Sequence, residues 1–246
     1  MRAALAVQQV TTSQDHNLQE LTSSMRRAAA LGADLVMFAE AAFTGLANDD
    51  DPEHDAALAT TVDGALVRAV CAEAERLRVH VALGFLEQDG GRLYDSALLI
   101  DRSGRAVFRY RRVSPGWHGP YADARFYGEG RHVDCFNAEF GRVAFLVCGD
   151  LFDDRLVDEI HRERPGLLLV PFARALSGGG HDQQRWDREE LPQYEARVRR
   201  AATPALLVNY LDEDYVGGAM VIGADGSRKE SLPLGQAGIL MVDLYS

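Results

Sequence analysis

Cys148 is the residue whose surroundings first suggest chemistry. It closes the apolar run 141–148, which is rich in Val and Phe and too short for a typical helix, so we predict a buried strand. Asp153 and Asp154 stand at an N-cap position, and apolar residues follow at helical spacing, which predicts a helix just past the cysteine. The positive end of a helix dipole favours a thiolate, the form that a nucleophile needs. Simple core packing is the alternative, because free cysteine is often buried.

Two charged residues occupy similar positions at the ends of other predicted strands. The strand 34–39 ends at Glu40, which has apolar neighbours on both sides and is therefore not an obvious surface residue. Arg112 closes a group of three arginines after the strand 106–110, where a charged edge that blocks strand pairing is the alternative. The loop 113–121 that follows is dense in Pro, Gly and aromatic residues and can fold over a pocket.

The elements that must position these residues alternate along the chain. In the first half we predict helices at 17–32 and 62–78 and strands at 1–9, 34–39, 79–86, 93–100 and 106–110. In the second half we predict strands at 166–172 and 205–210, a charged helix at 186–202, and a hairpin that begins at 216–222. This order favours an α/β fold with mixed sheets covered by helices. The halves share an element order, which suggests two sheets.

The amino-acid composition indicates a globular protein and argues against several kinds of binding partner. The 246 residues are 47% hydrophobic and 26% charged, as in a globular protein with a large core, and we expect one domain over residues 1–246. A net charge of −11, with a single lysine at Lys229, argues against a nucleic-acid or anionic-membrane surface. No apolar stretch is long enough to cross a membrane. The three cysteines lack metal-ligand spacing and are odd in number, so a reducing cytosol is expected.

The remaining cysteines and the most acidic stretch are given structural interpretations. Cys71 and Cys135 are expected to pack in the core. The stretch 48–54 is expected to be a solvated polar loop rather than a metal site.

Taken together, these residues and their neighbours resemble the nitrilase, or carbon–nitrogen hydrolase, superfamily. In that family a Glu stands before a Thr-Gly pair, a Lys follows Tyr-Arg, and a Cys ends an apolar strand ahead of an acidic turn and a helix. The corresponding segments here are 40–45 (EAAFTG), 110–112 (YRR) and 147–152 (VCGDLF). The likeness continues through 167–171, 195–209 and 218–226, so that it covers nearly the whole chain with the spacing preserved.

The resemblance implies a four-layer αββα sandwich of two mixed sheets covered by helices, commonly paired into a homodimer. It also implies that the enzyme cleaves a small non-peptide amide or carbamoyl compound through a cysteine thioester and releases ammonia or an amine. Cys148 would attack the carbonyl carbon, and Glu40 would move the proton. Arg112 and the backbone N–H of Gly149 would stabilise the oxyanion. Neither a metal nor an organic cofactor is implied.

The walls of the pocket are predicted from the loops around these strand ends. Trp117, Tyr121, Phe172 and Arg174 are expected to contact the substrate, together with the flexible segment 178–180. Arg174 either receives a substrate carboxylate or forms an exposed salt bridge.

Two departures from the family pattern leave alternatives open. Arg112 stands where the family has Lys, and a guanidinium keeps the charge but cannot transfer a proton. The family often has a second Glu before a Phe-x-x-x-Gly turn, and here Asp123 is the candidate for this second acid. A non-catalytic binding protein on the same scaffold is therefore the main alternative, and a thiol-redox protein is a third.

Overall fold

Two six-stranded sheets form the middle of the molecule. The computed structural model describes residues 1–244. The first sheet has the strand order β12-β1-β2-β3-β4-β5, and the second has the order β11-β10-β9-β8-β7-β6. The strands of the first sheet are β1 (Arg2–Val7), β2 (Leu35–Met37), β3 (His80–Asp89), β4 (Arg92–Ile100), β5 (Ala106–Arg111) and β12 (Gly238–Asp243). Those of the second are β6 (Cys135–Ala138), β7 (Gly141–Phe145), β8 (Leu167–Phe172), β9 (Ala205–Asn209), β10 (Ala219–Ile222) and β11 (Arg228–Leu232).

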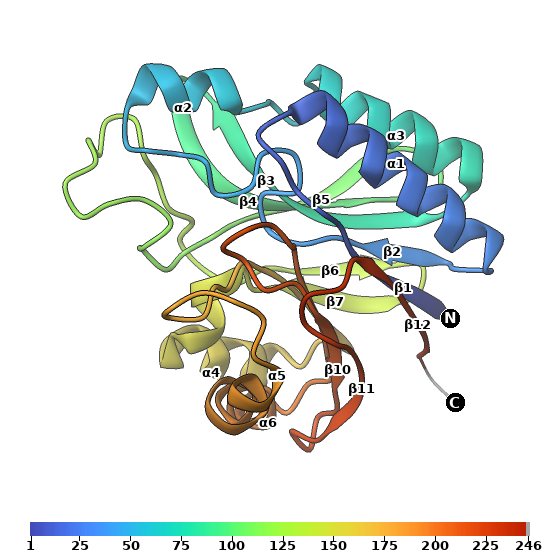
Figure 1. Ribbon diagram of the computed structural model, residues 1–246. Helices are drawn as coiled ribbons and strands as arrows, with labels where there is room; N and C mark the ends of the chain where they lie inside the picture. Colours follow the sequence, from blue (N-terminus) through green and yellow to red (C-terminus); the bar gives the residue numbers. More distant parts are fainter. Residues whose placement is uncertain (245–246) are drawn as a thin grey trace.

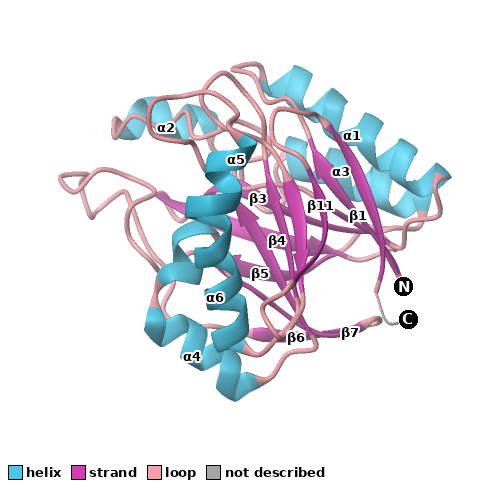
Figure 2. Ribbon diagram, turned by 60° about the horizontal axis from the view of Figure 1, so that its bottom comes forward, coloured by secondary structure: helices cyan, strands magenta, loops and turns pink. Residues whose placement is uncertain are grey.

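Helices cover the outer face of each sheet (Figure 1). The helices α1 (Gln14–Ala30) and α3 (Ala65–Leu77) lie on the first sheet, and α4 (Asp154–Glu163) and α6 (Leu191–Ala201) lie on the second. Figure 2 shows α4 and α6 next to each other in front of the strands. Both sheets contain parallel and antiparallel pairs, which confirms the predicted mixed α/β sandwich with its αββα layers.

Two apolar cores hold these layers together. The larger core lies between the sheets and includes Leu5, Met37, Phe145 and Leu169, all essentially without solvent exposure. Because side chains alternate between the faces of a strand, the neighbouring residues of β1 and β2 point the other way, into a second core under α1 and α3. Strands buried on both faces explain why the sequence reads as continuous apolar runs.

The acidic stretch before residue 55 is not the plain polar loop that we predicted. Asp51 caps a short helix, α2 (Pro52–Leu58), by accepting a hydrogen bond from the backbone N–H of Glu53. Asp55 is fully buried and accepts a 2.7 Å hydrogen bond from the hydroxyl of Tyr127. Proline at the first helical position and an aspartate N-cap are favourable for a helix start, so the sequence does contain the signal.

The late helix and the cysteine strand also differ in detail from the prediction. The segment 186–202 forms a π-helical turn over Trp186–Glu190 and then α6, preceded by the short α5 (Gln183–Arg185). Pairing in β7 ends at Phe145, three residues before the cysteine, and a short 3₁₀-helix spans Cys148–Phe152. The last strand, β12, pairs antiparallel with β1 and was not predicted.

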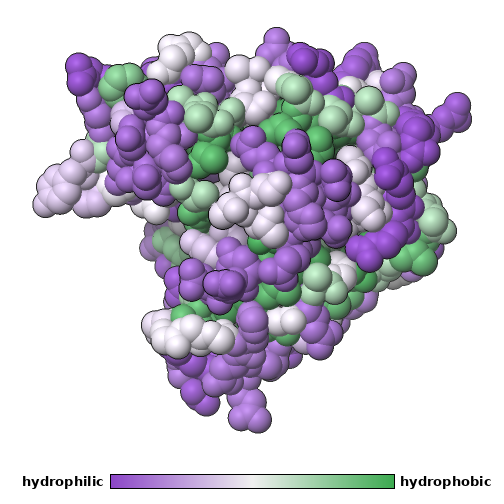
Figure 3. All heavy atoms as spheres, turned by 45° about the horizontal axis from the view of Figure 1, so that its top comes forward, coloured by the Kyte–Doolittle hydropathy of each residue, from purple (hydrophilic) through white to green (hydrophobic). Residues whose placement is uncertain are grey.

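The face that carries α1, α2 and α3 is largely hydrophilic, with apolar residues visible in separate patches (Figure 3). Within residues 1–244, no helix has both the length and the apolar character needed to cross a membrane.

Candidate active site

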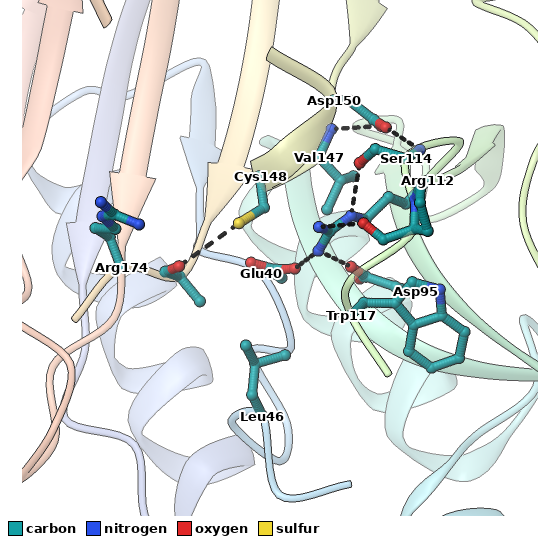
Figure 4. A network of polar contacts seen from close by, with 12 residues as sticks. Glu40, Leu46, Asp95, Arg112, Ser114, Trp117, Val147, Cys148, Asp150 and Arg174 are labelled. Atoms are coloured by element: carbon teal, nitrogen blue, oxygen red, sulfur yellow. Dashed lines mark hydrogen bonds and ion pairs between the residues drawn. The ribbon is translucent and has the colours of Figure 1, made fainter. Parts of the chain in front are cut away.

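Residues from four different elements meet between the two sheets. Glu40 follows β2, Asp95 lies within β4, Arg112 follows β5, and Cys148 comes after β7. Figure 4 shows their side chains gathered in one small region. The structure therefore brings together the thiol, the carboxylate and the guanidinium, and it adds a second carboxylate.

One nitrogen of Arg112 contacts both buried carboxylates. Its Nη1 lies 3.0 Å from Oε1 of Glu40 and 3.2 Å from Oδ2 of Asp95. Its Nε donates a 3.0 Å hydrogen bond to Oγ of Ser114. The Arg112 side chain is 6% exposed, and those of Glu40 and Asp95 are 0% and 4% exposed. A charged group buried this deeply needs compensation from a partner, and here one cation compensates two anions.

The second oxygen of Glu40 is left free. Among the described residues, Oε2 of Glu40 has no hydrogen-bond partner although it is buried. A buried polar atom without a partner is costly and calls for an explanation. Glu40 lies beside Cys148 (Figure 4), and a proton donor there would satisfy this oxygen.

Burial raises the pKa of Glu40 well above its usual value, and it is the largest cause of the shift. The negative charges of a Cys148 thiolate and of Asp95 raise the pKa further, whereas Arg112 lowers it. A carboxylate with a raised pKa is suited to accept a proton and to return it near neutral pH.

Cys148 is partly exposed, in contrast to the acids beside it. Its Sγ lies 3.5 Å from the carbonyl oxygen of Ala173, just past the end of β8.

The backbone of Cys148 has a φ of 46°, in the left-handed region, which is unusual for a residue other than glycine. Ala41, directly after Glu40, has a φ of 48°. Backbone strain of this kind tends to occur at functional sites, and here it lies at or next to the two residues that the sequence predicts for the chemistry.

Two glycines permit the close approach of these turns. A Cβ on Gly84 of β3 would lie 2.6 Å from Cα of Glu40, and one on Gly149 would lie 2.5 Å from Nη2 of Arg112. Neither backbone could approach as closely with a larger residue. Gly149 therefore has a packing reason for its identity, separate from the oxyanion role predicted for its N–H.

Asp150 ties the cysteine turn to the segment that carries Arg112. Its side chain accepts hydrogen bonds from the backbone N–H groups of Val113 (3.0 Å), Ser114 (2.6 Å) and Val147 (3.2 Å). The hydroxyl of Tyr110 donates a further bond of 2.7 Å. One buried carboxylate thus fixes the cysteine turn relative to the guanidinium.

The structure corrects two of the predicted site residues. Asp123, the candidate second acid, lies at the surface and is paired with Arg125, two residues away. Tyr121 is 97% exposed, so it cannot form a wall of an enclosed pocket. Both residues belong to a loop whose path depends on contacts that are distant in sequence.

The other three predicted contact residues are buried or already paired. Trp117 is 4% exposed and packs against His118 and Tyr127. Phe172 is 1% exposed and packs against Trp186 and Tyr194, with its ring 5.3 Å from that of Tyr194. Nε of Arg174 donates a 2.9 Å hydrogen bond to Glu190, as expected for the exposed salt bridge.

Asp95 and Asp150 belong to this cluster but were not predicted from the sequence. Asp95 interrupts the apolar strand 93–100 with a charge, and a charged residue in a strand predicted to be buried is a signal of a partner. Asp150 follows the cysteine in what was interpreted only as an acidic turn. In both cases at least one partner lies 17 or more residues away in sequence.

One group of side chains has donors placed closely enough for a metal ion. Donor atoms of Asp49, His54 and Asp55 lie within 4.8 Å of one another, on α2 and the loop before it. The carboxylate of Asp55 already accepts hydrogen bonds from the backbone N–H groups of Asp49 and Asp50. These hydrogen bonds explain why the three side chains gather at the start of α2.

The fold and this cluster define a protein of the nitrilase-fold class, and comparison with known families agrees. The family model described as carbon-nitrogen hydrolase matches residues 2–246. The chain therefore belongs to the carbon–nitrogen hydrolase family.

Curated relatives include several nitrilases. The aliphatic nitrilase of Rhodococcus rhodochrous is 26% identical over 279 aligned positions, which cover 98% of this chain and 74% of that protein. The arylacetone-specific nitrilase of Alcaligenes faecalis is 31% identical over 90 residues, which cover 36% of this chain and 24% of that enzyme.

Solved structures with the same fold include an amidase from Nesterenkonia sp. AN1. A variant of that amidase carrying acrylamide, added at its active-site cysteine, superposes with a TM-score of 0.82 and 23% identity, covering 99% of this chain and 93% of that one. Another variant, in complex with butyramide, also gives a TM-score of 0.82 at 23% identity, covering 99% of this chain and 90% of that one. The likeness supports the fold.

Proposed function

We propose that this protein is an amidase-like hydrolase that cleaves a small non-peptide amide or carbamoyl compound and releases ammonia or an amine. The observation that carries the proposal is a partly exposed thiol, Cys148, beside a fully buried carboxylate, Glu40 (Figure 4), whose Oε2 has no hydrogen-bond partner within residues 1–244. A non-catalytic binding protein has no need for a free buried carboxylate oxygen beside a thiol. The amides named for the Nesterenkonia amidase support an amide as the substrate class.

In the proposed first step, Oε2 of Glu40 takes the proton of the Cys148 thiol as the sulfur attacks the carbonyl carbon. A C–S bond forms, and the carbonyl electron pair moves onto oxygen. The resulting oxyanion is stabilised by the backbone N–H of Gly149 and the positive charge of Arg112. A donor of this kind contributes about 3–4 kcal/mol. Because its pKa is too high, Arg112 supplies charge and geometry and leaves proton transfer to Glu40.

In the second step, protonated Glu40 gives its proton to the leaving nitrogen as the C–N bond breaks. Ammonia or an amine departs, and the acyl group remains on Cys148 as a thioester. Water then attacks this thioester while Glu40 accepts the water proton, and that proton finally returns to the sulfur. The raised pKa of Glu40 suits both directions of this transfer.

We also propose that the chain acts as one domain and forms a homodimer, as is common in its family. Phe152 is 36% exposed and lies near the outer helices of the second sheet, where a partner would shield it. Sedimentation equilibrium of the wild type tests this, and a monomer at all concentrations would contradict the dimer.

Ammonia release across a panel of small neutral amides, with nitriles as a second arm, tests the proposed reaction. Cys148→Ala should abolish release, whereas Cys135→Ala, which removes another partly exposed thiol, should retain it. Turnover that persists in Cys148→Ala would contradict the mechanism. If neither protein releases ammonia while an amide still raises the melting temperature, the binding alternative replaces it.

A further inference from the structure

Asp95 is a second buried acid that the proposed mechanism does not use. Its Oδ2 and Oε1 of Glu40 lie 3.2 Å and 3.0 Å from the same nitrogen, Nη1 of Arg112. When all three groups are ionised, the cluster carries two negative charges and one positive charge. A single guanidinium nitrogen cannot compensate both carboxylates as fully as it would compensate one.

The position of Asp95 is fixed by the sheet. The backbone N–H of Arg112 donates a 2.8 Å hydrogen bond to the carbonyl of Asp95, so the two residues face each other where β4 and β5 pair. The side chain of Asp95 is 4% exposed and cannot swing into solvent. Its carboxylate is therefore held in contact with the guanidinium.

We propose that Asp95 is a positioning residue for Glu40: it holds the Arg112 guanidinium in place and takes a share of its positive charge. This role rests on the proposed function. If Arg112 were committed to Glu40 alone, it would stabilise the carboxylate strongly and make Glu40 a poor acceptor for the thiol proton. By dividing that charge, Asp95 leaves Glu40 able to accept and return a proton.

The charged groups that face Glu40 act on its pKa in the directions that this division of the Arg112 charge requires. Cys148 from the cysteine turn and Asp95 from β4 raise its pKa in addition to burial, and Arg112 is the group that lowers it. More distant contributions connect Glu40 with the hydroxyls of Tyr194, Tyr210 and Tyr215. Replacing Asp95 with asparagine removes one negative charge and leaves Arg112 intact, so the pKa of Glu40 should fall.

The test compares Asp95→Asn with Ser114→Ala as a matched control. Ser114 also bonds the guanidinium, through Nε, but carries no charge. The ionisation of Glu40 is followed by ¹³C NMR of labelled glutamate carboxylates, with its signal identified by its loss in Glu40→Gln. We expect the midpoint to move to lower pH in Asp95→Asn and to stay in place in Ser114→Ala. An unchanged midpoint in Asp95→Asn, or equal displacement in both variants, would overturn the role.

Activity provides a second readout. The acidic limb of kcat/KM against pH should move to lower pH in Asp95→Asn and not in Ser114→Ala. If Asp95→Asn does not fold, Asp95→Ser, which also removes the charge, should show the same direction. Because the NMR titration needs no turnover, the two proposals fail separately. A shifted midpoint in a protein that hydrolyses no amide would refute the proposed hydrolase and support the charge sharing. Turnover with an unshifted midpoint would support the hydrolase and refute the charge sharing.

Discussion

Two fully buried glutamates on the first sheet, Glu40 and Glu87, differ in how their oxygens are satisfied. Glu87 accepts hydrogen bonds on both oxygens, from Ser96 (2.5 Å), Arg109 (2.7 Å) and Arg111 (2.8 and 2.9 Å). Glu40 accepts one from Arg112, and its other oxygen has no partner among the described residues.

This difference separates a structural carboxylate from the one that we propose as the base. A carboxylate whose lone pairs are filled by fixed donors is stabilised as an anion and has no oxygen free for a proton. The two sites are neighbours in sequence, because Arg111 and Arg112 are consecutive and point to opposite faces of the sheet. The three arginines that sequence alone could not assign are therefore divided between an ion-pair network around the buried Glu87 and the candidate active site.

The largest expected effect comes from Glu40→Gln, which removes the base and keeps the shape of the side chain. We expect kcat/KM for a neutral amide to fall by about 10²–10⁴-fold, the usual contribution of a general base. Steady-state ammonia release measures this. Activity within a few-fold of wild type would show that Glu40 is not the proton acceptor.

The same variant should also be more stable, in a pH-dependent way. The pKa of Glu40 is raised in the fold above its ordinary value of 4.5, so between these two values the native state binds more protons than the unfolded state. Wild-type stability therefore falls as pH rises through this window. The melting temperature of Glu40→Gln should exceed that of wild type by more at pH 8 than at pH 4, and a gain that is independent of pH would contradict the assignment.

Glu87→Gln should differ from Glu40→Gln in both stability and activity. It leaves Arg109 and Arg111 without full compensation and should lower the free energy of unfolding by about 1–3 kcal/mol. Activity per folded molecule should be retained, since Glu87 lies outside the cluster around Cys148. Urea unfolding combined with ammonia release measures both quantities, and a stable but inactive Glu87→Gln protein would erase the distinction between the two glutamates.

Changing the charge of the substrate should have a smaller effect on kcat/KM. Arg112 and Arg174 already pair with carboxylates, and a neighbouring cleft of about 490 Å³ is lined in part by Asp212, Glu213 and Asp214. An amide that carries a carboxylate would meet like charges there, so its kcat/KM should be lower than that of a neutral amide of equal size by about tenfold or more. A preference for the carboxylated amide would mean that one of these arginines is released for binding.

Arg112→Lys should have the smallest effect. Both carboxylates contact the single atom Nη1, so one ammonium, although a bond shorter, can pair with both, and the main loss is the hydrogen bond from Nε to Ser114. One such bond contributes about 1 kcal/mol, which corresponds to a change in activity within about tenfold. A collapse of activity in a folded Arg112→Lys protein would show that the site requires the guanidinium plane.

Local sequence patterns predicted most strands and helices, because these segments have strong apolar periodicity, and the resemblance to the family implied that Glu40, Arg112 and Cys148 converge. Asp95 was missed because its partner, Arg112, is brought to it only when β4 and β5 pair. The loop residues Tyr121 and Asp123 were placed wrongly, because the path of a long loop is decided by tertiary contacts rather than by its own composition. The helix α2 was missed because its acids were interpreted as solvated, although Asp51 and Pro52 are favourable start residues.

The formation of a thioester on Cys148 is the central claim, and acid-quenched peptide mass spectrometry tests it most directly. The protein is mixed with an amide that supports ammonia release, quenched within one turnover, and digested. We predict that the peptide containing Cys148 gains the mass of the amide minus ammonia, whereas the peptides containing Cys71 and Cys135 remain unmodified. Ammonia release with an unmodified Cys148 peptide, or an adduct on another cysteine, would contradict this account.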